Sequence, residues 1–218
     1  KDLNDYNACA GGSFINYANK GSDEVKFLYT IFSGAHSVEF NVSGNRLSPD
    51  PGTGTSYGIG AEIALATASR KWELFAGFEY EMLEAETTYT IVQTFNSMTT
   101  TFAIDAKVFN VTMGPRYNFL LNDKHKIFID GALGLSLPSG EVDQDILVKP
   151  YDSAPYWAQF DKYELSSTIY GNFGIGYVFN NKFGLVFRYE TNRSIFDNTN
   201  TGTGADISRI GANLRYTF

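Results

Sequence analysis

Apolar side chains recur at every second position through most of this chain. From Trp72 to Met82 they hold the even positions, while the odd positions carry mainly glutamate and glycine. Side chains of a β-strand point alternately to its two faces, whereas an amphipathic helix repeats every ~3.6 residues. The chain is therefore expected to consist of strands that each have one apolar face. The same alternation runs through 57–65, 109–119, 127–135, 165–179, 183–189 and 210–218.

The connections between these runs are alternately short and long. Short polar turns are expected at 67–71, 121–125 and 179–182, and longer loops at 45–56, 94–100, 138–164 and 196–206. Short turns at one end and long loops at the other are typical of membrane barrels. The pattern predicts eight strands, at about 26–43, 55–66, 71–92, 99–120, 125–138, 164–179, 182–196 and 205–218. With an even number of strands, the first strand begins and the last strand ends on the short-turn side.

The direction of the apolar face separates a membrane barrel from a soluble sandwich or a lipocalin-like barrel. In the soluble folds the apolar face points inward and the charges point outward. Here the other face is rich in glycine, which suits a narrow barrel interior. Aromatic residues also gather at the short-turn ends of the strands, as in an interfacial girdle; they are Trp72, Tyr117, Phe119, Tyr177, Phe179, Phe183, Tyr216 and Phe218. The expected fold class is an all-β, eight-stranded, antiparallel, transmembrane up-and-down β-barrel.

The glycine-bearing face also carries charged residues of both signs. An eight-stranded barrel is filled by side chains, and charges buried there must be paired and hydrogen-bonded. We expect an ion-pair plug in the lumen, and a gated pore that uses the same residues is the alternative. The expected lumen charge network is Glu62, Glu73, Glu79, Glu81, Arg116, Asp130, Arg188, Glu190, Arg209 and Arg215, with Lys126 on the same face.

Composition and motifs argue against several other classes of function. The net charge of -7 is opposed to nucleic-acid binding, and the single cysteine, Cys9, excludes an internal disulfide and a cysteine metal cluster. Ser37 and Glu39 flank His36, but no nucleophile-elbow pattern surrounds the serine. His125 is expected to be a solvated turn residue. The oxygen-rich segment 197–206 lacks the spacing of a calcium loop. We expect no catalytic, cofactor-binding or metal-binding residues, and no enzyme.

The closing segment LRYTF resembles the C-terminal signal of bacterial outer-membrane proteins, which the barrel-assembly machinery reads. Leu214, Tyr216 and Phe218 match the alternating apolar positions, whereas Asn213 stands where that family usually has glycine. The region 26–218 is similar to the small barrels of the OmpA and OmpX type. The resemblance implies a Gram-negative outer membrane, surrounding lipids, the assembly machinery as a partner during insertion, and both chain ends in the periplasm.

The opening segment KDLNDYNACAGGSFINYANK resembles the junction in a group of Bacteroidota outer-membrane proteins that carry a periplasmic domain before the barrel. This resemblance implies that 1–24 is a periplasmic linker or the end of an upstream domain, and that 25–218 is the barrel.

The longest connection, 138–164, is expected to be a functional loop because loops of more than about 12–15 residues are usually functional or disordered. It contains six acidic and two basic residues. Its aromatic side chains favour contact with protein or sugar, so the loop is expected to pack over the barrel mouth or against another outer-membrane subunit. The expected partner residues are Tyr151, Tyr156, Trp157 and Phe160. The expected function is a non-enzymatic structural or accessory subunit of an envelope complex, bound through this loop to other outer-membrane subunits. The alternatives are a mobile acidic lid without a partner, a small-solute pore, and a lipid-modifying barrel enzyme.

Overall fold

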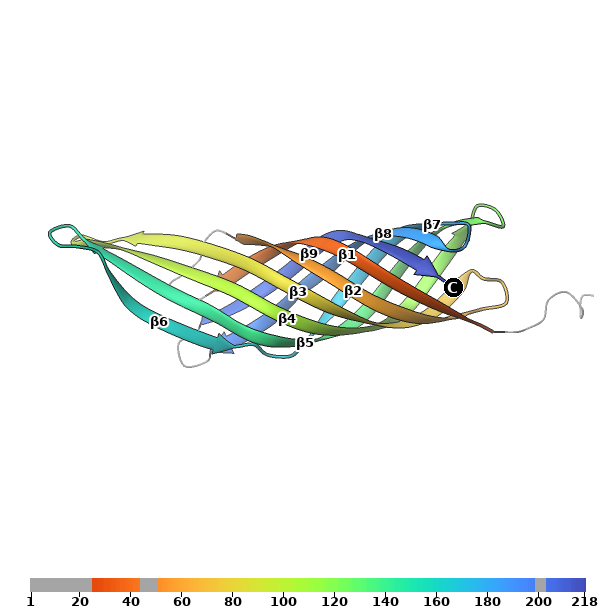
Figure 1. The fold of residues 1–218 in the computed structure, drawn as a ribbon, viewed down its shortest axis with the longest axis horizontal. Coiled ribbons are helices and arrows are strands. Elements are labelled where there is room, and N and C mark those ends of the chain that lie inside the picture. The colour runs from red at the N-terminus through yellow and green to blue at the C-terminus, as the bar shows by residue number, and fades with distance from the viewer. Residues whose placement is uncertain (1–24, 44–50, 199–202) are drawn as a thin grey trace, which may run out of the picture.

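The computed structural model describes residues 25–43, 51–198 and 203–218 (Figure 1). These residues form nine antiparallel strands, and the expected segment 1–24 lies outside them. The strands are β1 (Lys26–Ser43), β2 (Gly52–Ala66), β3 (Trp72–Val92), β4 (Asn96–Leu120), β5 (His125–Pro150), β6 (Tyr156–Glu164), β7 (Thr168–Phe179), β8 (Phe183–Asn198) and β9 (Thr203–Thr217).

Eight of these strands close into a ring. The strand order runs β4-β3-β2-β1-β9-β8-β7-β5, and β4 pairs with β5 to complete it. The first and last strands meet along a long register, from Thr30 opposite Thr217 to Ser43 opposite Gly204. Closure pairs the backbone groups that an open sheet would leave at its edges. The expected eight-stranded antiparallel up-and-down barrel is confirmed.

The prediction of a loop over 138–164 is wrong. β5 continues to Pro150 opposite β4, and β6 returns along β5 from Tyr156 to Glu164. Pro138 and Gly140 are of residue types that usually interrupt strands. Within β5, however, they fall between Ser136, where pairing with β7 ends, and Glu141, where pairing with β6 begins. A proline is tolerated in a strand where no neighbour needs its missing N–H group.

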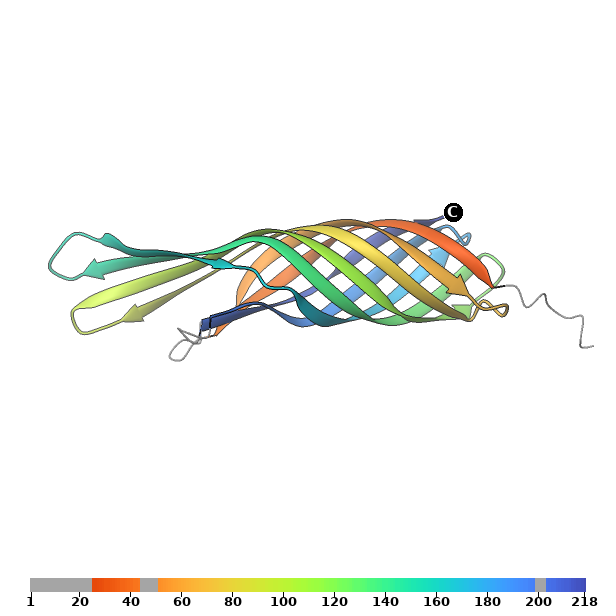
Figure 2. The same cartoon turned by 90° about the horizontal axis from the view of Figure 1, so that it is seen from below.

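The expected loop at 94–100 is also replaced by strand, because β3 and β4 stay paired as far as Val92 and Ser97. On the same side, β2 begins at Gly52, within the expected loop 45–56, and β8 continues to Asn198. The pairing of β2 with β3 extends only to Thr53 opposite Glu86. The ends of β3, β4, β5 and β6 therefore project beyond the rest of the barrel (Figure 2). We call this part, formed by 88–106 and 140–164, the projecting sheet.

The outer surface of the ring is apolar. Large hydrophobic side chains such as Ile59, Leu133, Ile169 and Leu214 are 64–71% exposed. Aromatic rings contact one another at the short-turn side, where Trp72 packs edge-on against Tyr117 and Tyr216 packs against Phe183. An apolar exterior around a closed ring of strands matches lipid rather than water. Among the described residues, no helix is long and apolar enough to cross a membrane.

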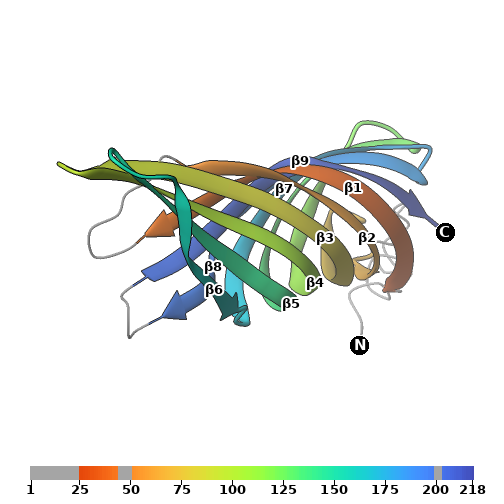
Figure 3. The same ribbon diagram turned by 60° about the vertical axis from the view of Figure 1, so that its left-hand side comes forward.

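The interior has two halves of different chemistry. Toward the projecting sheet lies an apolar cluster that includes Phe40 and Phe102, both fully buried. Tyr163 at the base of β6 stacks on Phe196 of β8 with ring centroids 4.9 Å apart, so β6 packs against part of this cluster. Figure 3 shows β6 close to β5 and β8. Toward the short turns the interior is charged. The start of β1 and the end of β9 lie at that charged end, where the Phe218 N–H donates to the Tyr29 carbonyl.

Candidate functional site: the charged lumen and the projecting sheet

The structure places all ten residues of the expected lumen charge network inside the barrel. Nine of them are buried, and the side chain of Arg188 is 10% exposed. Each lies at an inward position because its strand alternates without interruption up to that point. The structure then divides the ten residues into two clusters, which the sequence did not show.

The first cluster surrounds Arg116. Its guanidinium forms a two-point contact with Glu62, with nitrogen–oxygen distances of 2.6 and 2.7 Å, and also donates to Asp130 and Glu73. The rings of Phe75 and Phe128 lie about this guanidinium, with centroids 4.5 and 4.6 Å from its carbon. Arginine suits such a place because its planar group can fork to carboxylates and stack on aromatic faces.

Three further cations complete this Arg116 cluster. Lys126 lies 2.7 Å from Glu73, and Arg215 lies 2.8 Å from Glu62. Arg188 is more distant, at 3.9 Å from Glu62 and 3.7 Å from Asp130. The cluster therefore contains four bases against three acids.

The second cluster surrounds Arg209. Its guanidinium nitrogens lie 2.6 Å from Glu79, 2.7 Å from Glu81 and 2.6 Å from Glu190. Arg193 approaches Glu81 at 3.1 Å. This Arg209 cluster thus has two bases against three acids, so the excess of one positive charge in the Arg116 cluster is balanced across the lumen.

Arg193 is the lumen residue that the alternation of β8 missed. Strict alternation after Arg188 and Glu190 would turn Arg193 outward. The pairing of β8 with β9 shifts register between Glu190 and Arg193, and the irregularity turns Arg193 inward, where it is 2% exposed. A β-bulge of this kind changes which side chains face inward. No residue type in the segment marks the shift.

The catalytic candidates do not come together. His36 points into the lumen, where its Nδ1 lies 3.5 Å from Ser56 Oγ, whereas Ser37 and Glu39 are exposed on the opposite face of β1. His125 contacts the Tyr177 hydroxyl at the short-turn side. Among the described residues, no three histidine, cysteine or acidic side chains are placed to hold a metal ion. The segment 197–206 lies partly outside the described residues.

The expected assembly-signal residues lie along the outside of β9. Leu214 and Phe218 are exposed, and Tyr216 packs edge-on against Phe218 with centroids 5.1 Å apart. Since β9 pairs with both β1 and β8, this apolar row lies where the ring closes.

The expected partner residues lie on the projecting sheet. Tyr151 lies in the turn between β5 and β6, and Tyr156 and Trp157 begin β6; all three are more than half exposed. Phe160 lies opposite Asp145 in the β5–β6 pairing. They are therefore held by paired strands rather than by a loose loop.

Acidic side chains come together on one face where the projecting sheet joins the barrel. Register places Glu84 opposite Asp105, Asp105 opposite Glu141, and Glu141 opposite Glu164. All four side chains are exposed. Side chains opposite each other on antiparallel strands are about 5 Å apart at Cβ, and like charges in that relation are destabilising. Lys162, 2.5 Å from Glu141, offsets part of this repulsion.

No family model and no curated protein matches the chain. The solved structures that are similar to this chain include the following three. Ail, the attachment invasion locus protein of Yersinia pestis, is 15% identical, with 87% of this chain and 99% of that chain covered and a TM-score of 0.35. Neisserial surface protein A is 13% identical, with 86% of this chain and 97% of that chain covered and a TM-score of 0.38. The outer membrane protein OprG from Pseudomonas aeruginosa is 13% identical, with 89% of this chain and 97% of that chain covered and a TM-score of 0.41. Identities this low do not bear on function, and the barrel assignment rests on the strand pairing described above.

Proposed function

We propose that this chain is a bacterial outer-membrane barrel with a structural role, whose lumen stays closed and whose projecting sheet holds another envelope subunit. The short-turn side would face the periplasm, and the start of β1 and the end of β9 would both lie there. The apolar exterior supports the membrane, and the assembly-signal pattern of Leu214, Tyr216 and Phe218 supports the outer membrane in particular.

The observation that carries a structural role is the filling of the lumen. Charged side chains occupy one half of it and form paired clusters, while fully buried phenylalanines occupy the other half. Water and ions would have to separate the ion pairs and also cross the apolar cluster. Neither step is favourable, because desolvated ions need their partners. The interior therefore favours a plug over the alternative of a small-solute pore.

The observation that favours a protein partner is the exposure of large aromatic side chains on ordered strands. Aromatic residues are enriched at protein interfaces, where they bury much area at low entropic cost. Tyr151, Tyr156 and Trp157 lie beyond the barrel, away from the apolar belt that meets lipid. Their position suits contact with another protein at the cell surface.

The test is purification of the native protein in a gentle detergent, followed by mass spectrometry of the proteins that accompany it. We expect a stoichiometric outer-membrane partner with the unaltered chain. The triple variant Tyr151→Ser, Tyr156→Ser, Trp157→Ser should lose this partner and keep its barrel. Phe95→Ser is the matched control, because Phe95 is 80% exposed in the neighbouring β3–β4 turn.

A partner that remains with the triple variant would contradict the role of the β5–β6 aromatic residues. A chain that purifies alone in every preparation would contradict the accessory role altogether. Stepwise conductance of the reconstituted protein in planar bilayers would contradict the closed lumen and favour the pore.

A further inference from the structure

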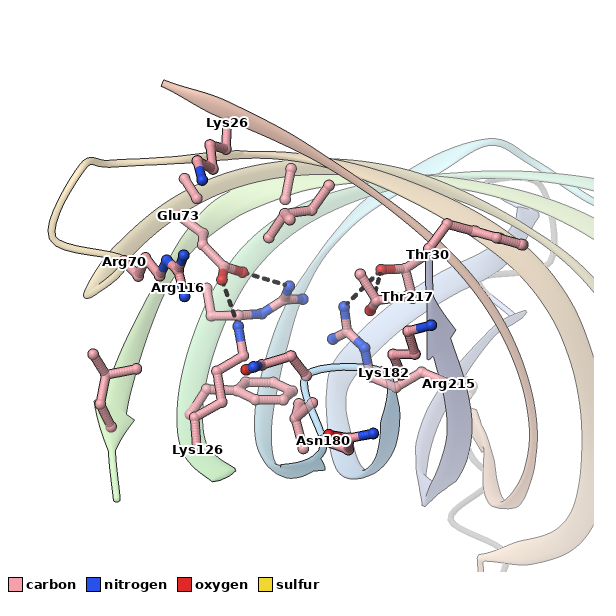
Figure 4. A pocket seen from close by; sticks show the side chains of 18 of the residues that line it. Lys26, Thr30, Arg70, Glu73, Arg116, Lys126, Asn180, Lys182, Arg215 and Thr217 are labelled. Atoms are coloured by element: carbon pink, nitrogen blue, oxygen red, sulfur yellow. Dashed lines mark hydrogen bonds and ion pairs between the residues drawn. The ribbon is translucent and has the colours of Figure 1, made fainter. Parts of the chain in front are cut away.

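A cavity of about 460 Å³ opens at the short-turn mouth of the barrel and extends inward as far as the Arg116 cluster (Figure 4). Its floor includes Arg116 and Glu62, and its rim includes the turns after β2, β4 and β7. We call it the short-turn vestibule. Its volume lies within the range of about 300–1,000 Å³ that is usual for small-molecule sites.

The lining of the vestibule is strongly cationic. Six basic and three acidic side chains contribute to it. Two of the acids, Glu62 and Glu73, are already held by Arg116, Lys126 and Arg215. The basic side chains are Lys26, Arg70, Arg116, Lys126, Lys182 and Arg215.

A buried hydrogen-bond donor in the vestibule has no acceptor. It is the Nε of Arg215, whose side chain is only 7% exposed. Within the described part of the chain, Lys26 and Lys182 form no ion pair, and they lie on opposite sides of the cavity (Figure 4). A buried donor left without a partner costs free energy, which a bound anion would recover.

The wall between the rim and the floor is apolar. Leu28 and Ala64 line one side, and Phe128 and Val178 line the other. Apolar walls lower the local dielectric constant and so strengthen the attraction of the cations for an anion. They also favour a ligand that carries a short hydrocarbon group.

We propose that the short-turn vestibule binds a phosphate monoester with a small apolar body. The phosphate would accept from Arg215, Lys126 and Lys182, and the apolar body would contact Phe128 and Val178. Three excess positive charges suit a phosphate monoester, which carries a charge of about -1.5 to -2 at neutral pH, better than a singly charged carboxylate. The ligand would enter from the short-turn side and stop at the Arg116 cluster. This site is separate from the projecting sheet and does not depend on the proposed partner.

The test is calorimetric titration of the full chain in nanodiscs of zwitterionic lipid, with butyl phosphate, inorganic phosphate and butanol as separate ligands. We expect butyl phosphate to bind with a dissociation constant below about 1 mM. Inorganic phosphate should bind at least about fivefold more weakly because it lacks the apolar body. Butanol should not bind measurably, and added salt should weaken the binding of butyl phosphate.

Two matched double variants locate the site. Lys26→Gln with Lys182→Gln removes one lysine that would donate to the phosphate and one further charge of the vestibule, and should weaken butyl phosphate binding about tenfold. Lys71→Gln with Lys124→Gln removes two exposed charges at the same end that do not line the cavity, and should change binding less than about twofold. All four lysines are exposed, so both variants should fold, and the strand content measured by circular dichroism checks this.

Equal weakening by the two double variants would overturn the vestibule as the site. Butanol binding as tightly as butyl phosphate would overturn the choice of an anion, and inorganic phosphate binding equally well would overturn the apolar body. If butyl phosphate gives no heat of binding at concentrations up to about tenfold above the expected dissociation constant of about 1 mM, the proposal as a whole is overturned.

Discussion

Glu62 is the residue whose neutralisation should most clearly expose the energetics of the lumen. Its two carboxylate oxygens contact Arg116 at 2.6 and 2.7 Å and Arg215 at 2.8 Å, with Arg188 at 3.9 Å. The substitution Glu62→Gln keeps the shape of the side chain and removes its charge. The Arg116 cluster would then hold four bases against two acids.

The expected loss of unfolding free energy is about 3–5 kcal/mol, the usual cost of removing one partner of a buried ion pair. The lower part of this range is favoured, since the amide oxygen of glutamine can still accept one hydrogen bond. Removing a like charge as well should relieve the repulsion. The double variant Glu62→Gln, Arg215→Met should therefore lose about 1–2 kcal/mol less than Glu62→Gln alone.

The assay is equilibrium unfolding in urea with the barrel in lipid, followed by tryptophan fluorescence and extrapolated linearly to water. Glu39→Gln is the control, because Glu39 is an exposed acid that accepts one hydrogen bond from Asn41, and it should change stability by less than about 0.5 kcal/mol. A loss below about 1 kcal/mol for Glu62→Gln would refute the view that the ion pairs are desolvated and mutually dependent.

Two further predictions concern the projecting sheet and the apolar half of the lumen. Asp105→Asn should stabilise the protein by up to about 0.5 kcal/mol, because Asp105 lies between Glu84 and Glu141, and the gain should shrink at high salt in the same urea assay; a loss of stability would contradict the repulsion. Phe102→Ala should cost about 3–5 kcal/mol, because the side chain is fully buried, and should still give no conductance in planar bilayers while the Arg209 cluster remains; conductance would mean that Phe102 alone closes the lumen.

Alternation alone predicted which side chains face the lumen wherever a strand keeps its period. Glu79 and Glu81 on β3 are such cases, since each is inward by parity and needs no knowledge of the other strands. The prediction failed for Arg193, because a shift in the register between β8 and β9 moves the inward-facing side chains from even to odd positions. No residue type in the segment indicates this shift. The prediction also failed at 138–164, where Pro138 and Gly140 signal a loop locally and are tolerated only because of the strands that flank them.

The partners within the lumen could not be predicted from the sequence. Glu62 and Arg116 are 54 positions apart, and their contact depends on the stagger of β2, β3 and β4 around the ring. The division into a charged and an apolar half has the same origin. It arises because strand tilt brings residues from distant positions to the same depth. The vestibule, likewise, is formed by turns that have no common motif.

Because the strands differ in length, one side of the barrel rim is higher than the rest. A ring of equal strands would present the same rim on every side, and a partner could approach it at any angle. Here four consecutive strands rise on one side only (Figure 2). A subunit seated on that side is held at one rotational position relative to the barrel, so the pair could turn in the membrane only as a single body. If the proposed partner binds there, the projecting sheet would fix its angular position around the barrel axis.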